Sequence, residues 1–274
     1  MYKSIVTEIV KRQKPKLLVI NASAFSQGNW NLTDEVYLRK WIDNMPMSQN
    51  KLDTVKTIPK NINKDDEKVK DNISDTLYFP LKKYHGNWKD PEAVYTSFVT
   101  RAYMRLSGGG YLKGFYSKTG ITGGRDNLAN IGQPTKEAYM LTDECREYLK
   151  ELLSYCNKLG IEHVLLLQPP HETQAADKSG LEQIESITKE YGYDFLDLST
   201  DYESIAGIDD SHDFADFEHL NAYGAKKLTA YIGDMAVNQY GIKSDTAKSE
   251  LSRWKKSVKR TKKALKMARE YTDR

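Results

Sequence analysis

The sequence predicts an α/β fold built on a parallel sheet, and two observations carry this prediction. Short apolar runs typical of strands alternate along the chain with longer segments of helical periodicity. One run, VLLL at 164–167, is apolar without interruption, which is typical of a strand covered on both faces. Because crossover helices join parallel strands, we expect helices to pack on the sheet.

The first part of the chain contains one clear strand. We expect a helix at 2–12 and a strand at 16–22, where LLVI forms the apolar run. Residues 51–75 are charged and nearly free of core residues, so we interpret them as an exposed connection. A helix at 90–106 is favoured because it opens on Asp-Pro-Glu, which combines a capping carboxylate with a proline at the first helical position.

The second part reads as alternating helices and strands. A helix begins at 142 and is closed by Gly160 in a left-handed cap. A strand at 161–167, a helix at 181–191 and a strand at 193–198 follow. This alternation is the pattern of β-α-β units and a parallel sheet.

A glycine-rich segment at 107–124 separates these two parts. It holds seven glycines together with tyrosines and lysines. A phosphate-binding loop follows a strand and opens a helix, so GGGYLKG alone is weak evidence for nucleotide binding. We interpret the segment as an irregular loop or a lid.

Composition excludes several classes. No run approaches the roughly 18 apolar residues of a membrane-spanning helix, and the first thirty residues lack a signal-peptide core. Cys145 and Cys156 lie in one predicted helix about 16 Å apart, which excludes a disulfide between them. No cluster of Cys and His has metal-ligand spacing, so we expect neither a metal nor a cofactor.

The basic charge of the protein belongs to its tail. Residues 243–274 hold twelve Lys or Arg against four Asp or Glu, a net charge of +8. An apolar seam with steps of three and four predicts an amphipathic helix within 241–274. The seam is formed by Leu251, Trp254, Val258, Thr261, Leu265 and Ala268. Either this seam docks a solvated helix on the body, or residues 245–274 contact an anionic membrane or polymer. No nucleic-acid motif accompanies the charge, so we expect no nucleic-acid partner.

A candidate acid-base pair lies in DFADFEHLNAYGAKK at 213–227, where Asp216 precedes His219 by three residues. A histidine activates a hydroxyl when one ring nitrogen faces the nucleophile while an acceptor holds the other nitrogen. Asp216, on the turn that enters a helix, is placed to be that acceptor. Alternatively, Asp216 only caps the helix that follows.

The same stretch resembles the final conserved block of the SGNH (GDSL-type) hydrolases, with its Asp, His-Leu-Asn and Gly-Ala in order. Three earlier stretches, KPKLLVINASAF, DNMPMSQNK and FPLKKYHGNW, resemble the DltD-like, envelope-associated branch of that superfamily. The resemblance covers roughly residues 14–232. It implies a three-layer α/β/α sandwich with a mainly parallel, flavodoxin-like sheet over residues 1–240. It also implies that Asp216 and His219 are the acid and base of a catalytic triad.

The nucleophile departs from the family pattern. The family's serine follows the first strand, whereas the strand at 16–22 resembles its third block, in which an asparagine, here Asn21, helps to stabilise the oxyanion. Both earlier blocks would then lie before Met1, so we expect the first strand and the nucleophile upstream and this chain to be inactive alone. Ser23, in NASAFSQG, is the reserve nucleophile.

Other candidate residues are placed by the resemblance or by strand ends. His85 and Trp88 match a family histidine and tryptophan above the active site, where they would hold an acyl acceptor; alternatively they are a surface histidine and a packed tryptophan. Gln168 and Asn21 lie at the carboxyl ends of predicted strands, where ligands of parallel sheets collect. His171 follows Gln168 and either lines the cleft or is solvated.

Two classes of function remain open. The resemblance implies a serine esterase or O-acyltransferase of the bacterial cell envelope, on its extracytoplasmic face, working through an acyl-enzyme. Its partners would be an acyl donor, a hydroxyl-bearing acceptor such as an envelope polysaccharide, and a membrane acyltransferase. The alternative is a non-catalytic binding or accessory module of the same fold.

Overall fold

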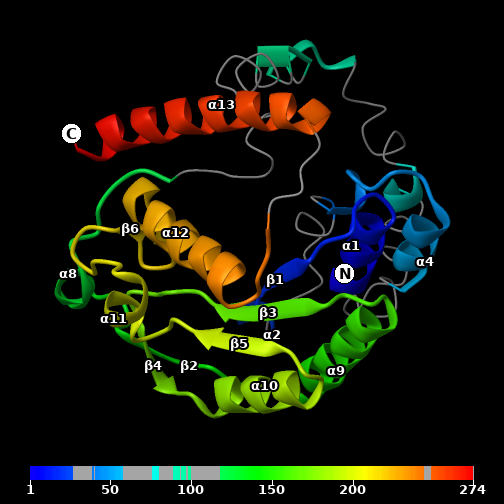
Figure 1. Cartoon of the computed structure of the whole chain (residues 1–274). Coiled ribbons are helices and arrows are strands. Elements are labelled where there is room, and N and C mark those ends of the chain that lie inside the picture. The colour runs from blue at the N-terminus through cyan, green and yellow to red at the C-terminus, as the bar shows by residue number, and fades with distance from the viewer. Residues whose placement is uncertain are drawn as a thin grey trace. The chain divides into compact units, whose positions relative to one another are not determined.

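The computed structural model describes most of the chain, and Figure 1 shows it whole. The described residues are 1–26, 39, 41–57, 76–79, 89–92, 94–96, 98–99, 118–243 and 248–273. The chain divides into two compact units. The first unit comprises Met1–Pro15, Asn29–Arg101 and Ser154–Gly160, and the second comprises Lys16–Gly28, Ala102–Leu153 and Ile161–Arg274.

Two helices pack together in the first unit, α1 (Tyr2–Val10) and α4 (Gln49–Thr57). The hydroxyls of Ser4 and Thr54 are 2.6 Å apart, and the Asn50 amide donates to the backbone oxygen of Ser4 at 2.9 Å. Val55 is fully buried in a small apolar cluster. The prediction of an exposed connection at 51–75 is therefore wrong for 51–57, where α4 buries Lys51, Thr54 and Val55. Residues 58–75 lie outside the described part.

The predicted helix at 90–106 is described only in pieces. Residues 91–92, 94–96 and 98–99 are helical. The backbone nitrogen of Glu92 donates to the Asp90 carboxylate at 3.0 Å, which is the capping bond that the Asp-Pro-Glu start predicts.

A parallel sheet lies in the second unit, as predicted. Its strands β1 (Leu17–Asn21), β3 (His163–Gln168) and β5 (Asp194–Asp197) are hydrogen-bonded in the order β1-β3-β5. Leu165 and Leu166 are fully buried, which explains the uninterrupted apolar run of β3. Because the strands are parallel, Asn21 and Gln168 end on the same edge of the sheet.

The connecting helices follow the expected order. They are α9 (Asp143–Lys158), α10 (Ser179–Glu190) and α12 (Ala222–Asn238). Gly160 closes α9 at a φ of +68°, a left-handed conformation that favours glycine. Helix α10 runs beside β5 (Figure 1) and buries Ile184 and Ile187. Both cysteines are free, in agreement with the sequence.

Shorter elements complete the second unit. They are α2 (Ser23–Ser26), α8 (Arg125–Asn130), α11 (Tyr202–Ala206), β2 (Lys136–Ala138), β4 (Gln174–Asp177), β6 (Phe214–Asp216) and β7 (His219–Leu220). A buried cluster of Leu198, Tyr202, Ile208 and Phe214 packs against apolar residues of β3, β5 and α12. Phe214 opens β6, so this cluster anchors the strand that carries Asp216.

The tail forms the helix that the sequence predicts, α13 (Lys248–Thr272). Its apolar seam is docked only in part, because Ala268 is buried whereas Leu251, Trp254 and Val258 are exposed. No helix in the described part of the chain is long and apolar enough to span a membrane.

Candidate acid-base site

Asp216 and His219 face each other across a tight antiparallel turn between β6 and β7. The carboxylate oxygen Oδ1 of Asp216 lies 2.7 Å from Nδ1 of His219 and also accepts the backbone N–H of Glu218 at 3.1 Å. A carboxylate only accepts hydrogen bonds, so Nδ1 carries the ring proton of neutral His219 and Nε2 keeps its lone pair. Among the described residues Nε2 has no hydrogen-bond partner, and half of the side chain is exposed, at 50%.

The helix after this turn is capped by Asn221 and not by Asp216. Its amide oxygen accepts the backbone N–H groups of Tyr223 and Gly224 at 2.9 and 3.2 Å. Its amide nitrogen donates to the backbone oxygens of Gly120 and His212. The asparagine of the His-Leu-Asn motif therefore ties three segments together, and the interpretation of Asp216 as a mere helix cap is wrong.

Lys118 is a member of the site that sequence reasoning missed. Its ammonium lies 2.8 Å from Oδ2 of Asp216 and 3.1 Å from Nδ1 of His219. Since Nδ1 already donates its proton to Asp216, the shorter of these contacts is the hydrogen bond. Lys118 is 98 positions before Asp216, and nothing in its local sequence distinguishes it from the other lysines.

These two donors hold Asp216 as a carboxylate. Burial opposes ionisation, but the hydrogen bonds from Lys118 and His219 outweigh it, so the pKa of Asp216 lies below its ordinary value of 3.8. An ionised Asp216 can stabilise positive charge on His219 when that ring takes up a proton.

The segment that presents Lys118 is the end of the glycine-rich stretch, and it is firmly held. Gly120, at a φ of +109°, donates to the Thr272 hydroxyl at 3.3 Å. Thr122 donates its backbone N–H to Phe214 and its hydroxyl to Glu172, at 3.2 and 2.5 Å. The sequence predicts an irregular loop or a lid at 107–124: residues 118–124 form no regular element apart from a bridge at Lys118, and residues 107–117 lie outside the described residues.

The loop that leaves β3 reaches this turn. Glu172 donates its backbone N–H to the oxygen of Phe217 at 3.2 Å. His171 is 5% exposed, so the solvated alternative for this residue is wrong, and its ring meets Tyr139 edge-on at 6.5 Å. Burial lowers the pKa of His171, although the charges of Glu218 and Asp216 raise it. A second, neutral imidazole therefore lies within the electrostatic reach of the acid-base pair.

Asn21 and Ser23 interact at the carboxyl end of β1. Both the backbone N–H and the hydroxyl of Ser23 donate to the side-chain oxygen of Asn21, at 2.9 and 2.7 Å. This fixes the amide of Asn21 and directs its nitrogen elsewhere as a donor. Ser23 is 8% exposed. Its single hydroxyl proton is given to Asn21, so its observed role is to orient that amide.

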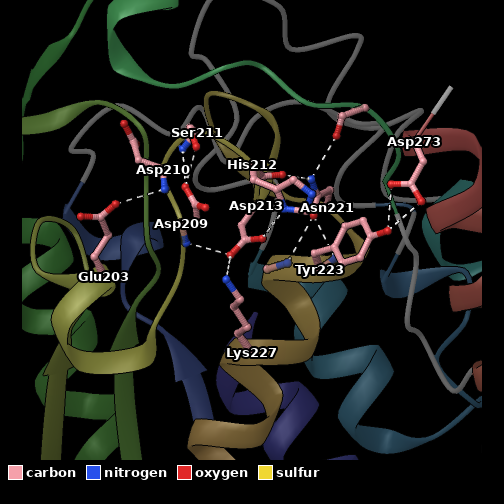
Figure 2. A network of polar contacts seen from close by, with 12 residues as sticks. Glu203, Asp209, Asp210, Ser211, His212, Asp213, Asn221, Tyr223, Lys227 and Asp273 are labelled. Carbon is pink, nitrogen blue, oxygen red and sulfur yellow. Dashed lines mark hydrogen bonds and ion pairs between the residues drawn. The ribbon is translucent and has the colours of Figure 1, made fainter.

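A second pairing of histidine with aspartate joins His212 to Asp213 (Figure 2). Asp213 is fully buried and receives the Lys227 ammonium at 2.6 Å, the backbone N–H of Asp209 at 2.8 Å and Nδ1 of His212 at 3.0 Å. Gly224 packs on it so closely that an added Cβ would meet the backbone oxygen of Asp213 at 2.5 Å. Asp213 is thus part of the framework of the turn.

The remaining predicted residues are placed as follows. Gln168 is fully buried at the end of β3. His85 and Trp88 lie outside the described residues. Within the part that the structure describes, no group of three His, Cys, Asp or Glu side chains is arranged to hold a metal ion.

Comparison with known proteins adds no relative. No protein-family model, no curated protein and no solved structure matches the chain.

Proposed function

We propose that Asp216 and His219 are the acid and base of an SGNH-type serine esterase or O-acyltransferase. Its substrates would be an ester-bearing acyl donor and a hydroxyl-rich acceptor such as a cell-envelope polysaccharide. The observation that carries this proposal is the geometry of His219, whose Nδ1 is held by Asp216 at 2.7 Å while Nε2 has no partner among the described residues. An imidazole held in this way is ready to accept a proton from a hydroxyl.

The reaction would proceed through two transfers of the acyl group. A serine hydroxyl attacks the ester carbonyl of the donor while its proton passes to Nε2 of His219. The C–O bond to the leaving alcohol breaks as the imidazolium returns that proton to the leaving oxygen. A hydroxyl of the acceptor, or water, then gives its proton to Nε2 and attacks the acyl-serine. The serine oxygen leaves and takes the proton back, so acyl group and proton balance over the cycle.

Asn21 would supply a hydrogen bond to the oxyanion. Its side-chain oxygen is occupied by both donors of Ser23, which leaves the amide nitrogen as the available donor at the edge where the parallel strands end. A donor whose orientation is fixed before the reaction stabilises developing charge without reorganisation. Ser23 is therefore a positioning residue in this proposal, and the nucleophile would be a serine of the family's first block.

The fold supports the same assignment at a coarser level. The sheet order β1-β3-β5 is parallel, helix α10 packs beside β5, and helix α12 packs against the buried cluster that contains Phe214 of β6. This arrangement is compatible with a three-layer α/β/α sandwich. Asn21 ends β1, and the loop that carries His171 leaves β3, at the carboxyl edge of this sheet, where open parallel sheets bind their ligands.

Lys118 favours a second candidate, a non-catalytic binding or accessory module of this fold. With Lys118 on Oδ2 and His219 on Oδ1, both oxygens of Asp216 are engaged. An aspartate satisfied in this way is also explained as a structural ion pair that fixes the turn. In that case His219 has no reacting partner.

A fluorophosphonate probe, which labels activated serines, separates the candidates. We expect no labelling of the 274-residue chain, and labelling of the chain preceded by its in-frame upstream sequence. In the extended chain, His219→Ala should slow labelling by about 10³-fold or more, and Asp216→Asn by less.

Three results would contradict this proposal. Labelling of Ser23 in the present chain would make that residue the nucleophile. An extended chain that does not react would favour the binding module. Labelling that is indifferent to His219→Ala would remove the acid-base role.

A further inference from the structure

Helix α13 exposes a dense basic surface. The helix contains ten Lys or Arg and two Glu. Five of its lysines are exposed and have no acidic partner among the described residues. They are Lys255, Lys256, Lys259, Lys262 and Lys263. A helix that served only to dock on the body would not need this uncompensated charge.

Apolar side chains are exposed on the first half of the same helix. Leu251, Trp254 and Val258 are 38%, 48% and 47% exposed. At about 100° per residue, these three positions fall within an arc of about 60°. Lys255, Lys259 and Lys262 project along one border of this arc. We call these six residues the α13 strip.

The second half of α13 is fixed to the region of the acid-base pair. Thr272 accepts the backbone N–H of Gly120 at 3.3 Å, two residues beyond Lys118. The Tyr223 hydroxyl donates to the carboxylate of Asp273 at 2.8 Å, and the guanidinium of Arg269 lies 5.0 Å from the Tyr223 ring centre. The apolar seam therefore packs on the protein near Ala268, whereas its residues in the first half of the helix are exposed to solvent.

We propose that the α13 strip is an interfacial lipid-binding surface, and that it binds bilayers with anionic headgroups. Apolar side chains beside lysines match such a surface in both of its components, because acyl chains accept Leu, Trp and Val while phosphates attract the ammonium groups. Lysine stems lie along apolar surface while their charged ends remain in the headgroup layer. An anionic polymer would use the lysines alone and would leave the apolar residues without a role.

Because α13 is bonded to residues on either side of the acid-base pair, lipid binding would also bring Asp216 and His219 to a membrane surface. The inference does not depend on acyl transfer, since binding is measured on the protein without any reaction. Its failure and the failure of the proposed function are therefore distinguishable.

Sedimentation of the 274-residue chain with vesicles at low salt tests the proposal. We expect binding to vesicles that contain phosphatidylglycerol and little binding to phosphatidylcholine alone. Lys255→Gln with Lys259→Gln should weaken binding about 30-fold, because each lysine near the surface contributes about fivefold. The matched control is Lys14→Gln with Lys136→Gln, two exposed lysines outside α13, which should change binding less than about twofold.

A second variant tests the apolar half of the strip. Leu251→Ser with Val258→Ser should weaken vesicle binding about tenfold or more while binding to heparin, a polyanion without acyl chains, stays unchanged. Circular dichroism verifies that each variant keeps its fold. Equal binding to both kinds of vesicle would overturn the proposal, as would full vesicle binding by the lysine variant. Full vesicle binding by the serine variant would overturn it in favour of a polyanion surface.

Discussion

The two pairings of histidine with aspartate, His212 with Asp213 and His219 with Asp216, use the same side chains and differ in burial. Asp213 is fully buried, while Asp216 is 37% exposed. Both aspartates also bind a lysine, Lys227 and Lys118 respectively. The residue types therefore do not distinguish a buried pair from an exposed one.

The hydrogen bonds around each aspartate account for the difference. Asp213 receives the backbone N–H of Asp209, and its own backbone oxygen accepts Asn221, so it fixes the chain before α12. His212 packs its ring against Tyr223 at 4.6 Å. His219 makes no ring contact among the described residues and is half exposed. His212 and Asp213 thus hold the turn in place, whereas the side chains of His219 and Asp216 are partly exposed to solvent on it.

The largest expected effect comes from removing the buried aspartate. Asp213→Ala should lower the free energy of unfolding by about 2–4 kcal/mol, because the Asp209 N–H loses its buried acceptor and Lys227 loses its counter-ion. Asp216→Ala should cost less than about 1 kcal/mol, since its partners are more than a third exposed. Urea unfolding of both variants measures this difference. Equal losses would mean that the two pairs are not distinct in kind.

A glycine on α12 sharpens the comparison at an intermediate scale. Gly224→Ala places a Cβ 2.5 Å from the backbone oxygen of Asp213, and we expect a cost of about 1–3 kcal/mol. The control is Gly233→Ala on the same helix, where nothing lies within 4 Å. That exchange should stabilise by about 0.5–1 kcal/mol, because alanine favours a helix interior. Thermal unfolding compares them, and a harmless Gly224→Ala would show that Asp213 is not held by close packing.

The smallest effect concerns the exposed pair and its lysine. An aspartate whose pKa is lower in the folded chain contributes stability that is complete above its ordinary value of 3.8 and is lost as the pH falls through the lower, folded pKa. Lys118→Met removes one of the two side-chain donors that lower it. The pKa of Asp216 should therefore rise, and stability near neutral pH should fall by less than about 1 kcal/mol.

Carboxyl carbon NMR of the folded protein follows this titration directly. Lys227→Met serves as the control, because Lys227 contacts Asp213 and should leave Asp216 unchanged. An Asp216 titration that is the same with and without Lys118 would mean that the ion pair at 2.8 Å does not govern this carboxylate.

Local features of this protein were predictable from its sequence. The strands β1, β3 and β5, the helix α9 with Gly160 at its end, and the tail helix all follow from periodicity and capping residues. The contact between Asp216 and His219 was predictable for the same reason, because three residues on a tight turn bring two side chains together. Such features depend on neighbours within a few positions, which the sequence displays directly.

The tertiary structure decided which distant residues contact Asp216 and His219. Lys118 reaches Asp216 from 98 positions away, and the buried environment of His171 depends on Tyr139 and on the turn at Phe217. Asn221, not Asp216, caps α12, because the turn commits Asp216 to His219 and leaves Asn221 at the first free amides. The sequence alone determined that an aspartate and a histidine stand three residues apart. Only folding, which places distant charges and determines burial, decided their partners and their exposure to solvent.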